Sequence, residues 1–262
     1  MIEPISIDVG IAKAEQAGPL RERLARAVDD LMASLPAPER LCPAERRGII
    51  ARYCAVLEGN FIYWMTSAYL AARTDEARSI IQDNLFEEVR DCHPGMLRKF
   101  VIASHCIPDS SDAMAIYPEL TKVRRFVGRL SPVPIIAMMA FFEDFIRRFM
   151  PYLAELARRQ GSDEFEYTTV HGISDIMHTR ELFRALDAEM AARVKSRRSG
   201  DESLSEGVRL LHALIGTIVA GSAAQGAGHD GDGTTRPQER PSLRRPTKSE
   251  GAPGKHVPAG GG

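Results

Sequence analysis

The sequence of 262 residues lacks a surplus of either charge: 34 lysines and arginines stand against 35 aspartates and glutamates. Without a basic excess there is no electrostatic attraction to nucleic acid or to an anionic membrane, so we expect neither as a partner. It also lacks an apolar run long enough to cross a bilayer, since the stretch from Pro134 to Phe142 stops at Glu143 and Asp144. The N-terminal residues show no basic stretch followed by an apolar core, as a secretory signal would. We therefore predict a cytoplasmic protein.

Cysteine is scarce and scattered. The four cysteines, Cys42, Cys54, Cys92 and Cys106, lie far apart and form no CxxC pair. This spacing gives no zinc-ribbon or redox-motif signature, and free thiols in a reducing cytosol are the expected state. The length and the 44 % of hydrophobic residues instead provide for a packed core.

Alternation of apolar and polar residues, the mark of a half-buried strand, is missing over any useful length. Apolar residues instead recur at helical spacing, which predicts an all-α fold. Pro151 is expected to kink the helix over residues 131–159 or to end its first half. The expected helices cover residues 20–35, 43–72, 75–90, 96–107, 118–130, 131–159, 162–198 and 203–224.

The C-terminal part of the chain differs in composition. Residues 225–262 consist mostly of glycine, proline, serine, threonine and charged residues, with almost no large apolar side chain. Such a segment cannot bury enough surface to offset its ordering entropy. We therefore predict one helical domain over residues 1–224 and a disordered tail over residues 225–262.

The strongest chemical signal is HGISDIMH, which runs from His171 to His178. On a helix, His171, Asp175 and His178 occupy positions i, i+4 and i+7 and share one face. Two neutral imidazoles and one carboxylate suit a divalent ion such as iron or manganese. An alternative remains open, in which the two histidines share a hydrogen-bonded core site with Asp175 and bind no metal.

A second segment, DNLFEE, places an acid on an apolar helix face. Glu88 follows Ile81 and Leu85 at helical spacing, whereas Glu87 points away and should be more solvated. His93 comes shortly afterwards. The alternative for Glu88 and His93 is an ordinary helix end, with a half-exposed acid and a capping residue.

A third segment, PIIAMMAFFEDFIRRFM, places Glu143 inside an apolar run. An ionised carboxylate there is costly unless a cation or hydrogen bonds compensate it. Arg147, four residues later, could supply a salt bridge instead of a metal. If Glu88, Glu143 and Asp175 all bind two Fe(II) ions, about one positive charge is left over, which would favour a bound anion such as a substrate carboxylate.

Taken in chain order, these segments resemble the sequence pattern of the haem-oxygenase-like di-iron oxidases. The resemblance runs through DNLFEE, HPGML, FFEDF and HGISDIMH and covers most of the helical part of the chain. It implies a seven-helix haem-oxygenase-like bundle. The gap between the acid and His93 is shorter than in the family pattern, so Glu87 is an alternative to Glu88, and Glu58 is a candidate for an additional ligand. The implied ligands of two Fe(II) ions per chain are Glu88, His93, Glu143, His171, Asp175 and His178.

The resemblance also implies an activity, the O2-dependent oxidation of a small amine or amino-acid-like substrate. The reaction would be N-oxygenation or oxidative cleavage of a C–C or C–N bond in a biosynthetic pathway, with O2 and an electron donor as further partners. No histidine precedes His93, which argues against haem as substrate. Manganese instead of iron, and a homodimer, stay open. So do two other classes: a metal-free enzyme of the thiaminase or cofactor-biosynthesis type on the same fold, and a non-enzymatic helical interaction protein.

Overall fold

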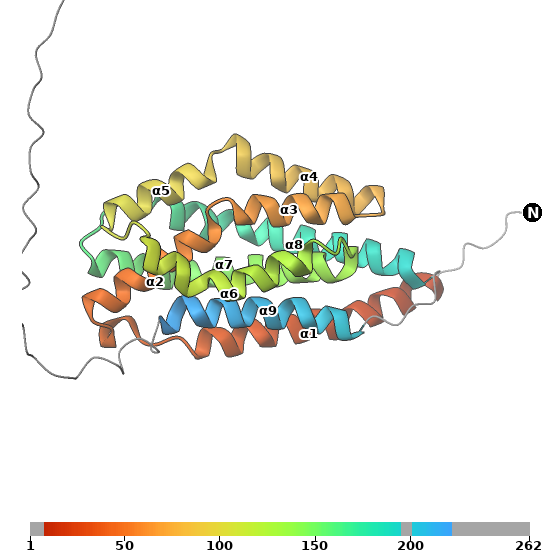
Figure 1. The fold of residues 1–262 in the computed structure, drawn as a ribbon. Coiled ribbons are helices and arrows are strands. Elements are labelled where there is room, and N and C mark those ends of the chain that lie inside the picture. The colour runs from red at the N-terminus through yellow and green to blue at the C-terminus, as the bar shows by residue number, and fades with distance from the viewer. Residues whose placement is uncertain (1–7, 195–200, 222–262) are drawn as a thin grey trace, which may run out of the picture. The chain divides into compact units, whose positions relative to one another are not determined.

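The computed structural model describes the backbone of residues 8–194 and 201–221, and the side chains of residues 20–193 and 205–221. All regular secondary structure in these ranges is helical (Figure 1), so the all-α prediction is confirmed. The predicted count of seven helices is wrong, because these ranges hold nine α-helices and one short 3-10 helix. The predicted tail over 225–262 and the domain boundary before it lie outside the described residues.

The helices have the following bounds in chain order: α1 (Asp8–Ala33), η1 (Pro38–Arg40), α2 (Pro43–Leu57), α3 (Asn60–Ala71), α4 (Asp75–Arg90), α5 (His93–Ala103), α6 (Ser110–Val127), α7 (Pro132–Arg159), α8 (Glu166–Val194) and α9 (Asp201–Ala220). The prediction for residues 75–90 matches α4, and Thr74 caps it by accepting a hydrogen bond from the Ala77 amide. No helix among the described residues is both long enough and apolar enough to cross a membrane.

The helix predicted over residues 43–72 is two helices. Gly59 separates α2 from α3 with φ of +76°, a conformation that glycine adopts at little cost. The Asn60 side chain then donates a hydrogen bond of 2.8 Å to the Val56 carbonyl, which no longer has a helical partner of its own. The chain therefore turns at this point, and Glu58 lies at the corner.

Prolines break fewer helices than the sequence suggested. α5 begins at His93 rather than near residue 96, because Pro94 is accepted in a first helical turn. Cys92, with φ of +56°, makes the turn that separates α5 from α4. Pro118 and Pro151 both lie inside helices, α6 and α7, that continue past them. The early start of α5 brings His93 into the helical framework instead of leaving it in a loop.

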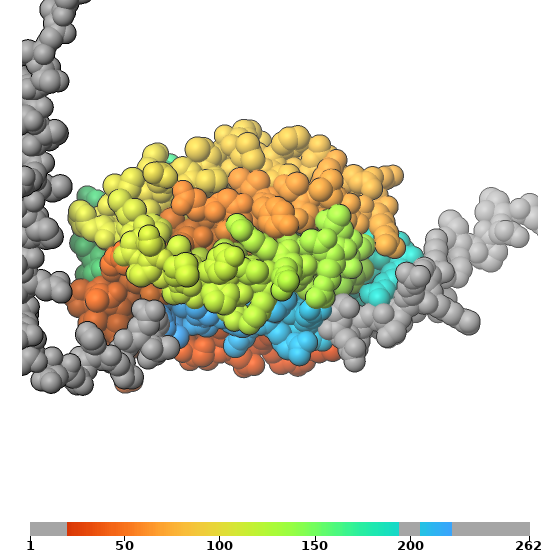
Figure 2. Space-filling model, viewed as in Figure 1, coloured from red at the N-terminus to blue at the C-terminus, as the bar shows by residue number. Residues whose placement is uncertain are grey.

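α7 is the central helix of the described part of the chain. It packs against α1, α2, α3, α8 and α9, and its buried residues point in all directions around its axis. In the space-filling view, α3, α4, α5, α6 and α9 form most of the visible face and little of α7 is visible (Figure 2). The middle of α7 is buried, and Glu143 within it is only 2 % exposed.

Substitution of Gly59 should destabilise the protein through the backbone alone. A Cβ at this position meets no atom within 4 Å, so Gly59→Ala tests only the cost of positive φ. We expect the free energy of unfolding to fall by about 1 kcal/mol in urea denaturation. Gly216→Ala is the matched control, because Gly216 lies inside α9 with equally open surroundings. It should stabilise the protein by about 0.5–1 kcal/mol, and equal effects of both variants would contradict the assignment of strain to Gly59.

Candidate metal centre

The six predicted ligands lie together in the core as two groups of three. Within each group, one nitrogen or oxygen atom from each residue lies within 4.8 Å of the other two. All six residues are at most 5 % exposed. Four helices, α4, α5, α7 and α8, supply them. The first group is Glu88, His93 and His171, and the second is Glu143, Asp175 and His178.

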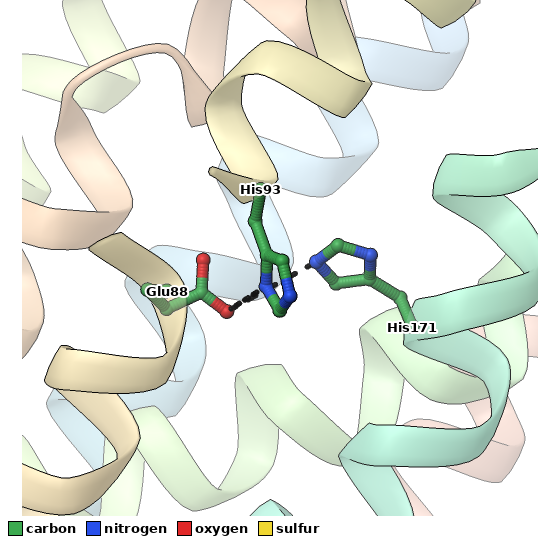
Figure 3. A group of neighbouring side chains, drawn as sticks. All are labelled: Glu88, His93 and His171. Atoms are coloured by element: carbon green, nitrogen blue, oxygen red, sulfur yellow. Dashed lines mark hydrogen bonds and ion pairs between the residues drawn. The ribbon is translucent and has the colours of Figure 1, made fainter. Parts of the chain in front are cut away.

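In the first group, His93 lies between Glu88 and His171 (Figure 3). The Nδ1 of His93 is 2.8 Å from Oε1 of Glu88, and Nε2 of His171 is 4.0 Å from the same oxygen. The Nδ1 of His171 lies 2.9 Å from the carbonyl oxygen of Tyr167, which can only accept. His171 therefore carries its proton on Nδ1 and presents the lone pair of Nε2 to the group, as a metal-binding histidine does.

In the second group, Asp175 is an acid without a partner. Both of its carboxylate oxygens are buried, and no group in the described part of the chain donates a hydrogen bond to them. The Nδ1 of His178 is 3.7 Å from Oδ1 of Asp175, too far for a hydrogen bond. A buried carboxyl group in this condition is costly, and a cation at the centre of the group would remove the cost.

Glu143 is not compensated by the salt bridge that its sequence suggested. Arg147 instead binds Asp144, with 2.7 Å between Nη2 and Oδ1, and Arg148 binds the same carboxylate at 2.8 Å. Asp144 thus faces the arginines while Glu143, the next residue back, faces Asp175 and Glu88. The two adjacent acids of α7 have separate roles, and only Glu143 belongs to the cluster.

The cluster changes the protonation of its own members. Burial, followed by the charges of Asp175 and Glu88, raises the pKa of Glu143 well above its usual range. Burial and the charge of Glu88 do the same to the pKa of Asp175. Burial lowers the pKa of His171 to about 4, so its imidazole is neutral at pH 7. Without a cation the acids hold protons, and a divalent ion would displace them.

Both acids at the end of α4 reach the cluster. Glu88 belongs to the first group, whereas Oε2 of Glu87 lies 3.2 Å from Nε2 of His178 in the second group. The side chain of Glu87 is 36 % exposed and that of Glu88 only 7 %, which confirms the predicted difference in solvation. Glu87 is therefore a fourth carboxylate at the edge of the cluster rather than a replacement for Glu88.

Glu58, the candidate for an additional ligand, belongs to neither group. Its side chain is exposed at the end of α2, and Arg98 lies 3.2 Å from it. Tyr167 is a residue of the site that the sequence reasoning missed. It precedes His171 by one helical turn, and its hydroxyl lies 2.8 Å from that of the buried Tyr53. Its spacing of four residues before His171 is the one signal that could have identified it.

A pocket adjoins the first group. It contains about 420 Å³ of empty space, part of it open to solvent. Its lining includes Glu88, His93, His171 and Glu143 of the two groups, and also Glu58. The pocket therefore gives a small molecule access to the first group and to Glu143 of the second.

Replacement of Asp175 by asparagine should stabilise the metal-free protein. The pKa of Asp175 is raised in the folded state. Its contribution to the free energy of unfolding is therefore largest below its unfolded pKa and is lost as the pH rises toward the folded pKa. Asp175→Asn removes the charge, so we expect a gain of about 1 kcal/mol or more at pH 8 and a smaller gain at pH 5. Urea denaturation in the presence of a chelator, at pH 8 and at pH 5, measures the two changes in the free energy of unfolding.

Asp144→Asn is the matched control for this experiment, because Asp144 is also a buried acid of the region but has two arginine partners. It should destabilise the protein by about 2 kcal/mol at both pH values, since it leaves charges partly buried and unpaired. A loss of stability in both variants would mean that Asp175 has a partner that compensates its charge.

Comparison with known proteins assigns no family to this chain. No family model matches it, and no curated protein matches it. The similarity to haem-oxygenase-like di-iron oxidases therefore stays a prediction from four short segments. The case for a metal centre rests on the two buried groups of ligands and on the carboxylate of Asp175.

Proposed function

We propose that this protein is a non-haem di-iron enzyme of the haem-oxygenase-like kind, which uses O2 to oxidise a small amine or amino-acid-like molecule. The reaction class is N-oxygenation or oxidative cleavage of a C–C or C–N bond. The single observation that carries the proposal is the pair of buried groups, each with histidine and carboxylate ligands, of which Asp175 has no other partner among the described residues.

The donor atoms favour iron or manganese over other ions. Each group combines imidazole nitrogen with carboxylate oxygen and contains no cysteine, whereas structural zinc sites in proteins use cysteine and histidine in closed sets of four. Three ligands for each ion leave coordination positions open. Open positions are typical of metal sites that bind a reactant rather than hold a fold together.

The protein's own residues prepare the site in three ways. The Tyr167 carbonyl fixes the proton of His171 on Nδ1, so that Nε2 faces the first group. The pocket leads a small molecule to His93 and His171. The core of α7 around Glu143, which includes the buried rings of Phe142 and Phe145, keeps bulk water away from the reacting atoms. Bound iron would supply the electrons that reduce O2.

A second candidate function is supported by one contact. The Glu88–His93 pair, 2.8 Å apart and lining a pocket, is also the arrangement of a general acid–base pair in a metal-free enzyme. A metal-free enzyme of this kind gives no reason for the burial of Asp175 and Glu143. The third possibility, an interaction protein with structural histidines, leaves them equally unexplained.

Anaerobic titration of the chelator-treated protein with Fe(II) tests the proposal. We expect about two irons per chain, and a change in visible absorbance on exposure to air-saturated buffer with candidate amines. His178→Ala should lose iron from the second group, while His212→Ala, which removes an exposed histidine of α9, should retain the full stoichiometry. Absence of specific iron uptake, with or without amines, would sink the proposal and favour the metal-free enzyme.

Metal binding should also release protons. Because the pKa values of Glu143 and Asp175 are raised in the metal-free protein, an ion that binds their carboxylates must displace protons, and its apparent affinity should increase from pH 6 to pH 8. Titration calorimetry with Mn(II) in two buffers of different ionisation enthalpy measures the number released. Asp175→Asn should release fewer protons than the wild type when it binds Mn(II). If wild type and variant release the same number, Asp175 is not a ligand.

A further inference from the structure

The pocket beside the first group has an uneven distribution of charge. Most of its wall is hydrocarbon, and no lysine or arginine lines it. Glu88, His93, His171 and Glu143 also line it, but these are the side chains that would hold metal. Glu58 is then the one acidic residue of this lining that belongs to neither group of ligands. The apolar residues of the wall are Leu57, Phe61, Ile62, Pro94, Leu97 and Ile146.

Glu58 is placed at this position by the backbone. It ends α2 immediately before Gly59, whose positive φ turns the chain into α3. Arg98 of α5 approaches the Glu58 carboxylate to 3.2 Å, but its side chain is 72 % exposed and does not line the pocket. An ion pair between two exposed side chains contributes little, so Arg98 would yield readily to a cation arriving from the pocket.

The metal groups themselves give no reason to bind an anionic substrate. Counted from Glu88, Glu143 and Asp175 alone, two divalent ions would keep one uncompensated positive charge. The structure adds the carboxylate of Glu87, 3.2 Å from His178, and this fourth negative charge completes the balance. No positive charge is then left over to favour a substrate carboxylate.

We propose that this pocket binds a small apolar primary amine that carries no carboxylate. Its ammonium group lies against Glu58, its hydrocarbon body lies along the walls formed by Leu97 and Ile146, and its other end faces His93 and His171. The inference rests on the proposed function in taking the pocket as the substrate site, and it narrows the substrate class from amino-acid-like molecules to amines. Because this orientation holds the nitrogen at Glu58 and not at His93 and His171, it also narrows the reaction from N-oxygenation or C–N cleavage to oxidative cleavage of a C–C bond.

Three probes of one chain length and different charge test this assignment: hexylamine, hexanol and hexanoate. Titration calorimetry at pH 7.5 on metal-free protein and on protein loaded with redox-inactive Zn(II) measures their affinities. Glu58→Gln should weaken hexylamine binding about three- to tenfold, leave hexanol unchanged, and leave hexanoate unchanged or tighten it. Ile62→Trp, which narrows the pocket at a half-buried position, should weaken hexylamine and hexanol alike.

Glu166→Gln is the matched control, because Glu166 is another exposed glutamate that pairs with a cation of α5, Lys99, but does not line the pocket. It should leave all three affinities unchanged. The inference is overturned if hexylamine does not bind, if its affinity is the same in Glu58→Gln, or if Glu166→Gln has an equal effect.

The binding experiment separates this inference from the proposed function. Hexylamine binding that depends on Glu58, in a protein that takes up no iron, would keep the amine pocket and remove the di-iron proposal. If the two groups of ligands take up iron but the affinity for hexylamine is unchanged in Glu58→Gln, the di-iron proposal is kept and the amine pocket is overturned.

Discussion

The enclosure of carboxylates in a hydrocarbon core is the constraint on which the rest of this structure depends. Glu88, Glu143 and Asp175 are all at most 5 % exposed, and Arg147, whose charge acts on Asp175, is paired with Asp144, as is Arg148. Burial and mutual repulsion raise the pKa values of Glu143 and Asp175, so the metal-free fold tolerates them as protonated acids. A bundle built for stability alone would have apolar side chains there.

The helices hold these acids at the cost of small departures from regular geometry. Cys92 adopts a positive φ between α4 and α5, which lets Glu88 at the end of one helix and His93 at the start of the next lie 2.8 Å apart. α8 needs no such device, because positions i, i+4 and i+7 of a regular helix already align His171, Asp175 and His178. All positive-φ residues of the described ranges lie outside the helices, and two of them, Gly59 and Cys92, adjoin residues that line the pocket or belong to the cluster.

The two groups of ligands have different surroundings. All three residues of the first group line the pocket, whereas of the second group only Glu143 does, and His178 of that group contacts the partly exposed Glu87. A small molecule can thus approach one group and water or protons can approach the other from the side of Glu87. This asymmetry follows from the neighbouring positions of Glu87 and Glu88 on α4, which point about a hundred degrees apart on the same helix.

The sequence by itself determined the helical class. Helical spacing and the inward direction of a charged residue within an apolar run also indicated Glu88, Glu143, His171, Asp175 and His178. His93 joined this set through its nearness to Glu88 in the sequence and through the family resemblance, because no helical spacing placed it. The sequence did not determine where α2 ends, since a glycine is compatible with a helix until its φ is known, nor that Arg147 binds Asp144. Only the tertiary structure decided these, together with the position of Glu58 on a pocket wall and the contact of Glu87 with His178. Each depends on residues far apart in the chain, and local periodicity carries no information about which helices become neighbours.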